Sequence, residues 1–177
     1  MTAGKTVRGL GLISGGLDSM LAARLLMEQG VEVTGISFVT PFFGAKNAEA
    51  AAVRVGFALI VRDITAPHLA MVKQPPSGYG RQMNPCIDCH ALMLGVAGEV
   101  MDAEGFDFLF TGEVLNERPM SQSLRSLNRV ANLSGRPGHV LRPLSALRLK
   151  ETAVEREGKV VRARLLTIGP EYEDAAM

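Results

Sequence analysis

The chain of 177 residues is long enough for one domain with a buried core, and 47% of its residues are hydrophobic. This composition excludes a chain that is disordered throughout. The formal net charge of +1 excludes binding of nucleic acid by bulk charge alone, and the absence of tryptophan argues against a stacking surface for single strands. The sequence has no apolar run long enough for a signal peptide or a membrane span, so we expect a cytoplasmic protein with no membrane contact.

Strand and helix patterns alternate along the chain. In chain order we expect a strand at 10–13, a helix at 18–29, a strand at 31–39, a helix at 45–55, a strand at 57–64, a loop at 65–85, a helix at 88–102, a strand at 106–110, a helix at 121–133 and a strand at 140–141. Repeated units of this length predict an α/β fold, with a doubly wound, mostly parallel five-stranded sheet and helices on both faces. In such sheets ligands bind beyond the carboxyl ends of the strands.

The segment at residues 14–19, SGGLDS, follows the first expected strand and opens the first expected helix. Its two glycines allow a tight turn, and backbone N–H groups at a helix start favour an anion. Asp18 is the exception, because a carboxylate beside phosphates is repulsive unless it caps the helix or contacts Mg²⁺; both alternatives stay open. We assign the nucleotide phosphates to Ser14, Gly15, Gly16, Leu17, Asp18 and Ser19.

The SGGLDS segment closely resembles the signature of the PP-loop ATP pyrophosphatases, which cleave ATP between its α and β phosphates and adenylate a substrate. Three further segments, TGEVL at 111–115, SQ at 121–122 and LRPL at 141–144, are similar in order and spacing to the catalytic domain of tRNA 4-thiouridine synthases. NPCIDC at 84–89 resembles the cysteine segment of tRNA 2-thiouridylases. The resemblance covers about residues 11–150.

This resemblance implies an adenine nucleotide alpha hydrolase-like fold and the cofactors ATP and Mg²⁺. The PP-loop catalytic domain is expected at residues 1–150, and residues 151–177 are expected to be an extension or tail of the same domain. The carboxyl ends of the second and fourth strands are assigned to the nucleotide as well, through Ser37, Phe38, Thr111, Gly112 and Glu113. For Glu113 a plain helix cap remains an equal alternative.

The only cysteines are Cys86 and Cys89, at an expected loop-to-helix junction. A helix start lowers a thiol pKa, so this position favours the thiolate that persulfide chemistry needs, and the second thiol allows release of sulfur by disulfide formation. We assign catalysis to Cys86, Cys89 and Asp18, with a slight preference for Cys89 as the nucleophile. Metal ligation by the two cysteines stays open. An iron–sulfur cluster is not favoured, because it needs further ligands or a dimer partner.

Residues 116–150 contain seven Lys and Arg and one acid, which suggests a face prepared for anions. Arg118, Arg125 and Arg129 have nearly helical spacing, which would let them contact successive groups along the backbone of a polyanion. We assign substrate contacts to Arg118, Arg125, Arg129, Arg142 and Lys150, with solvated surface charge as the alternative.

The preferred hypothesis is ATP-dependent transfer of sulfur to a uridine base of tRNA through an adenylated intermediate, with the sulfur carried on Cys86 or Cys89. The partners are then tRNA, a sulfur donor protein or sulfide, and a second copy of the chain if it forms a homodimer. The RNA-binding portion that precedes this domain in 4-thiouridine synthases has no counterpart in the sequence, so another means of presenting tRNA is expected. Two alternatives stay open: adenylation of a small molecule, and a non-catalytic nucleotide- or metal-binding subunit that needs a partner.

Overall fold

The computed structural model describes residues 5–79, 85–118 and 120–169 and contains a five-stranded sheet in which every pairing is parallel. The strand order is β3-β2-β1-β4-β5. The strands are β1 (Arg8–Leu12), β2 (Glu32–Val39), β3 (Ala58–Asp63), β4 (Phe108–Thr111) and β5 (Val140–Leu141). The doubly wound prediction is therefore confirmed. The strand order reverses between β1 and β4, which is where such sheets open a ligand crevice.

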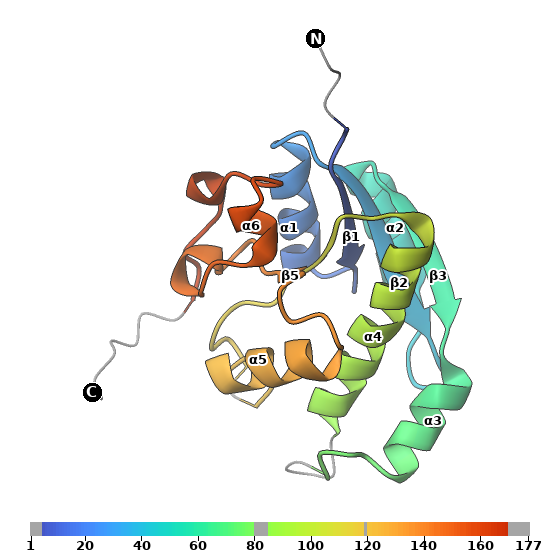
Figure 1. Ribbon diagram of the computed structural model, residues 1–177. Coiled ribbons are helices and arrows are strands. Elements are labelled where there is room, and N and C mark those ends of the chain that lie inside the picture. Colours follow the sequence, from blue (N-terminus) through green and yellow to red (C-terminus); the bar gives the residue numbers. More distant parts are fainter. Residues whose placement is uncertain (1–4, 80–84, 119, 170–177) are drawn as a thin grey trace, which may run out of the picture.

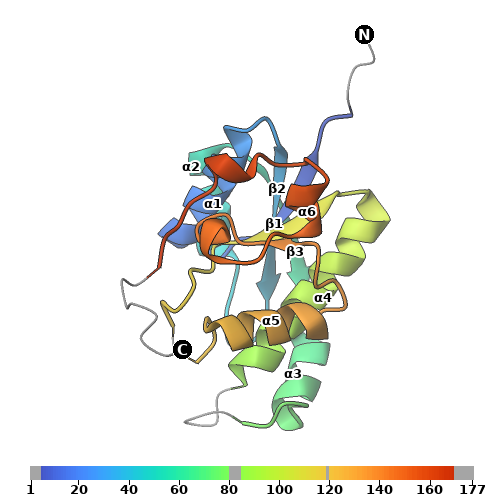
Figure 2. The ribbon, with the colours of Figure 1, turned by 60° about the vertical axis from the view of Figure 1, so that its left-hand side comes forward.

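Helices cover both faces of the sheet, as Figures 1 and 2 show. The α-helices are α1 (Leu17–Met27), α2 (Lys46–Val55), α3 (Thr65–Lys73), α4 (Cys86–Glu104), α5 (Leu124–Leu133) and α6 (Ala153–Arg156). Alternation along β4 separates two cores, because Phe108 and Phe110 pack with α1 and α2 whereas Leu109 packs with α4 and α5. None of the helices in the described part of the chain is long and apolar enough to cross a membrane.

The segment after β5 packs against the core that contains α1. It includes two short 3-10 helices, Ala146–Arg148 and Arg162–Arg164, on either side of α6. Val154, Val160 and Leu165 are buried in this core, and the backbone N–H of Ile168 donates to the carbonyl of Leu144 at 2.7 Å. The extension that we expected after residue 150 thus contributes apolar side chains to the core through its described part.

The region 65–85 contains the clearest departure from the sequence prediction. We expected a loop, but residues 65–73 form α3. Pro67 lies in the first turn of this helix, where proline is tolerated because its missing N–H has no intrahelical acceptor. The helix also starts without a side-chain cap at Ile64, so the usual start signal is absent. Residues 80–84, including Asn84 of the resemblance, lie outside the described residues.

Two helix starts also differ from the prediction. Helix α4 begins at Cys86, two residues before the expected start. Helix α5 begins at Leu124 because Ser123 caps it, accepting a hydrogen bond from the N–H of Ser126 at 3.1 Å. These shifts place Cys86 inside a helix and leave Gln122 in the preceding loop.

Candidate functional site

The turn between β1 and α1 is built on a glycine that no other residue can replace without strain. Gly15 has a φ of +88°, and a Cβ at this position would lie 2.4 Å from the carbonyl carbon of Asn47. Gly16 is the N-cap of α1 and makes no side-chain cap. The hydroxyl oxygen of Ser14 accepts a hydrogen bond from the backbone N–H of Gly16 at 3.2 Å. The first N–H groups of α1 have no intrahelical acceptor, so this turn has the geometry of an anion site.

Asp18 is the second residue of α1 and not its N-cap, so the capping alternative for its carboxylate is wrong. Its side chain lines a cavity at the carboxyl ends of the strands. Ser19 lies one residue further, and its hydroxyl donates to the carbonyl of Gly16 at 2.8 Å. Asp18 is therefore the carboxylate that the start of α1 brings to this cavity.

The turn after β4 packs directly against the start of α1. A Cβ on Gly112 would lie 2.5 Å from the backbone nitrogen of Ser19 and 2.6 Å from the carbonyl carbon of Asp18. Because both atoms belong to the backbone, neither can move aside without displacing the helix start. The glycine at this position thus allows the 111–113 segment to lie against the turn at residues 14–19.

Glu113 is the centre of a buried polar cluster. Its carboxylate accepts hydrogen bonds from Nε of Arg142 at 3.0 Å and from the Thr111 hydroxyl at 2.9 Å, and it lies 3.2 Å from Nδ1 of His90. Burial alone would raise the pKa of Glu113. The hydrogen bond from His90 and the charge of Arg142 outweigh burial and lower this pKa to about 2. Glu113 is therefore an anion at neutral pH, and it does not act as the helix cap that we considered.

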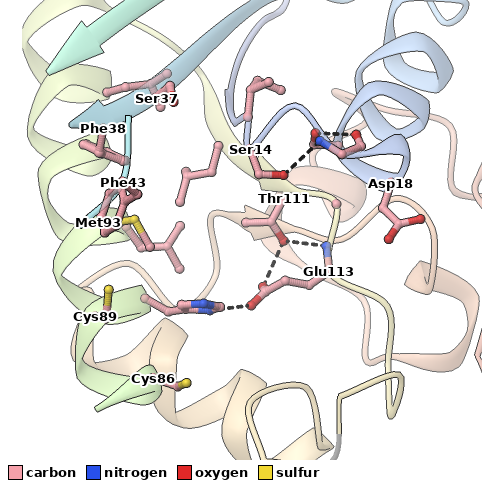
Figure 3. A pocket seen from close by; sticks show the side chains of 18 of the residues that line it. Ser14, Asp18, Ser37, Phe38, Phe43, Cys86, Cys89, Met93, Thr111 and Glu113 are labelled. Atoms are coloured by element: carbon pink, nitrogen blue, oxygen red, sulfur yellow. Dashed lines mark hydrogen bonds and ion pairs between the residues drawn. The ribbon is translucent and has the colours of Figure 1, made fainter. Parts of the chain in front are cut away.

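The Glu113 cluster and the turn at residues 14–19 open into one cavity of about 490 Å³ (Figure 3). Ser14 and Asp18 lie on one side of it, and Cys86 and Cys89 lie across from them on α4. The predicted residues that line it are Ser14, Gly16, Asp18, Ser19, Ser37, Phe38, Cys86, Cys89, Thr111, Gly112, Glu113 and Arg118. A volume of this size is typical of small-molecule and cofactor sites.

Some predicted site residues lie outside the cavity lining. Gly15 provides the positive φ of the turn and lies against Asn47. The side chain of Leu17 is directed to solvent, with 74% of the residue exposed. Arg125, Arg129 and Lys150 are exposed. Arg142 was expected to contact substrate but is buried, and its guanidinium donates to Glu113 and to the carbonyl of Leu127 at 3.2 Å. This arginine therefore holds Glu113 in place, which replaces our assignment to substrate.

The two cysteines differ in their surroundings. Cys86 is the first residue of α4, and Cys89 lies one turn further, with its Sγ 3.4 Å from Nε2 of His68. We expected the helix start to lower the thiol pKa and Cys89 to be the nearer residue to it. Burial and the charge of Cys86 instead raise the pKa of Cys89 to about 11, and Cys86 occupies the helix start. Among the described residues, no three His, Cys, Asp or Glu side chains are placed to share a metal ion.

Sequence reasoning missed several residues of the cavity. Helical periodicity was the available signal on α4, because residues 86, 89, 90 and 93 follow the i, i+3, i+4, i+7 pattern of one helix face. His90 and Met93 share that face with the cysteines and line the cavity. Phe43 comes from the loop after β2, where nothing in the sequence marked it. His68, to which we assigned no role, contacts Cys89 from α3.

Comparison with known proteins identifies the family. The family model described as Thiamine biosynthesis protein (ThiI) matches residues 2–156, which is most of the chain. The chain belongs to the ThiI family.

Curated relatives of this ThiI-family chain include a probable tRNA sulfurtransferase of Moorella thermoacetica, 32% identical over 154 residues that cover 82% of the chain and 38% of that protein. Another, from Bacillus licheniformis, is 26% identical over 172 residues that cover 92% of the chain and 40% of that protein. The chain thus spans about two fifths of the length of these relatives.

Solved structures support the fold of this ThiI-family chain. A 4-thiouridine synthetase in complex with RNA and bound ATP has a TM-score of 0.61 and 24% identity, over 77% of this chain and 36% of that chain. A predicted subunit of a tRNA methyltransferase from Methanocaldococcus jannaschii has a TM-score of 0.52 and 20% identity, over 77% of this chain and 67% of that chain. At these identities the likeness shows a shared fold.

Proposed function

We propose that this domain uses ATP to adenylate a carbonyl oxygen of a uridine base in tRNA and then transfers sulfur to the activated carbon. The observation that carries the proposal is that the turn at residues 14–19 and both thiols line one and the same cavity. Membership of the ThiI family and the names of the curated relatives, probable tRNA sulfurtransferases, support it.

ATP is assigned to the part of the cavity nearest α1. The phosphates take the turn at residues 14–19, and the rest of the nucleotide takes Ser37 and Phe38 of β2 together with residues 111–113. Magnesium is usually bound by one or two carboxylates and by substrate phosphates, and the carboxylate of Asp18 fits that role. When bound, the ion would neutralise charge on the departing pyrophosphate.

Adenylation converts a poor leaving group into AMP. The uridine oxygen bonds to the α phosphorus as the bond to the β phosphate breaks, and pyrophosphate leaves. A persulfide sulfur on one cysteine then bonds to the carbon, and AMP leaves with the former carbonyl oxygen. Attack by the second cysteine on the first releases the thiolated base and forms a disulfide between Cys86 and Cys89, which two external thiols reduce as they form a disulfide of their own.

The basic residues around the cavity are proposed to guide the RNA backbone. Arg118 lines the cavity, and Arg125 and Arg129 lie exposed on α5. Phosphate contacts of this kind position a nucleic acid without reading its sequence. Lys150 is a further exposed cation, after β5.

A pyrophosphate-release assay with ATP, tRNA and a persulfide donor tests the proposal. We expect release to depend on tRNA, and incorporation of sulfur into tRNA to be lost in Cys86→Ser and Cys89→Ser proteins while adenylation continues. The absence of RNA-dependent pyrophosphate release, with and without the sulfur donor, would refute the proposal. Formation of AMP with a small molecule in place of RNA would instead favour the small-molecule alternative.

A further inference from the structure

His68 is a buried histidine that the proposed function does not use. It lies in the first turn of α3 with 5% of its surface exposed, and the rings of Phe42 and Phe43 approach its ring at centroid distances of 5.7 and 5.4 Å. Its Nε2 is 3.4 Å from Sγ of Cys89. Its Nδ1 is buried without a hydrogen-bond partner in the described structure. Leaving such an atom unpaired destabilises the fold, so packing alone would be better served by an apolar side chain.

The surroundings of His68 and Cys89 keep both side chains uncharged before any reaction. Burial lowers the pKa of His68, so the imidazole is uncharged at neutral pH. Burial and the charge of Cys86 raise the pKa of Cys89 to about 11, so its thiol keeps the proton. A neutral thiol is a poor nucleophile, and Cys89 can react only if its proton leaves as the new bond forms. The imidazole nitrogen in contact with its sulfur is the group placed to take that proton.

We propose that His68 accepts the proton of the Cys89 thiol when that thiol reacts. The identity of the electrophile rests on the proposed function. In that setting the Sγ–H bond of Cys89 breaks, the proton passes to Nε2 of His68, and the sulfur electron pair bonds to Sγ of Cys86. The bond from Cys86 to the transferred sulfur breaks, and this sulfur stays on the base with the electron pair. His68 thereby makes Cys89 the resolving thiol and Cys86 the sulfur carrier.

The test uses the full chain with Cys86→Ser, in which Cys89 is the sole cysteine. The second-order rate of alkylation by iodoacetamide at neutral pH is measured with His68 intact and in His68→Gln. Glutamine preserves a polar side chain of similar size but cannot accept a proton. We expect the rate to fall by on the order of tenfold or more. His139→Gln is the matched control, because His139 precedes β5 at the amino end of the strand whereas Cys89 lines the cavity at the carboxyl ends, and we expect it to leave the rate unchanged.

A purely structural role of His68 predicts that the alkylation rate does not fall. If His68 only covers the sulfur, His68→Gln leaves the alkylation rate unchanged or raises it, and this result would overturn the proposal. The solvent isotope effect on alkylation of the protein with His68 intact gives a second measurement that needs no change at this buried site. Proton transfer during attack predicts a slower rate in D₂O, whereas an equal or faster rate contradicts it. Neither measurement uses ATP or RNA, so failure of the proposed function would leave both results interpretable.

Discussion

Replacing Arg142 with methionine should leave the Glu113 carboxylate buried without its cation. The side chain of Glu113 is 10% exposed and that of Arg142 is 6% exposed, so water cannot take over this role. The pKa of Glu113 is about 2, against 4.5 for a free glutamate. A difference of this size corresponds to about 3 kcal/mol in favour of the charged form in the fold. His90, Arg142 and Thr111 share this lowering of the pKa, so the expected effect of Arg142→Met comes from breaking a buried ion pair, which lowers the free energy of unfolding by about 3 kcal/mol or more.

A double-mutant cycle measured by urea unfolding checks this reasoning. Glu113→Gln combined with Arg142→Met removes both charges, so the loss of stability should be smaller than the two single losses added together. Arg125→Met, at an exposed site on α5, is the control and should change stability by less than about 0.5 kcal/mol. Additive losses, or a loss below about 1 kcal/mol for Arg142→Met, would refute the argument that the pair is coupled and desolvated.

The Glu113 carboxylate also predicts how the free energy of unfolding falls at acid pH. A folded-state pKa below the unfolded value means that the stabilisation is present above pH 4.5 and is lost as the pH falls towards 2. Unfolding free energy measured across this window should fall more steeply in the original chain than in Glu113→Gln. Parallel curves would show that Glu113 does not carry this dependence.

Three further substitutions test the nucleotide and RNA assignments. Gly112→Ala should weaken ATP binding at least tenfold in calorimetry, because the new Cβ meets the backbone of Ser19 at 2.5 Å; Gly95→Ala on α4, where a Cβ meets nothing within 4 Å, should bind ATP normally. Asp18→Asn should abolish magnesium-dependent pyrophosphate release while binding ATP at least as well in the presence of a chelator, since a carboxylate repels bare phosphates; weaker binding without metal would contradict the cation role. Arg125→Gln should reduce the salt slope of tRNA binding by about one. The control is Arg54→Gln on α2, which packs on the face of the sheet opposite α5, and it should not reduce this salt slope.

The features of the fold that periodicity records could be predicted from the sequence. The five strands alternate with helices whose apolar stripes are long enough to identify, and β5 was expected at 140–141, where it lies. Helix α3 was missed because its signals conflict. Pro67 indicates a break, Ile64 gives no cap, and the proline-rich run from Pro75 follows closely. Tertiary packing against α4 decides the conformation of this segment, and a sequence window does not contain that information.

The same limit explains which parts of the site were accessible from the sequence. The glycine turn could be predicted because the need for positive φ and close backbone approach is local at Gly15. The partners of charged and nucleophilic groups are not local: Arg142 lies 29 residues from Glu113, and His68 lies 21 residues from Cys89. Arg142 was assigned to substrate because the sequence shows its charge but not its burial. The thiol of Cys89 looked activated because the helix start was visible, whereas the desolvation that outweighs it arises from residues brought in by other elements. The reactivity of each polar group in this cavity therefore depends on the partner that folding brings to it. The His68–Cys89 contact has the largest consequence, because it changes which cysteine is assigned as the sulfur carrier.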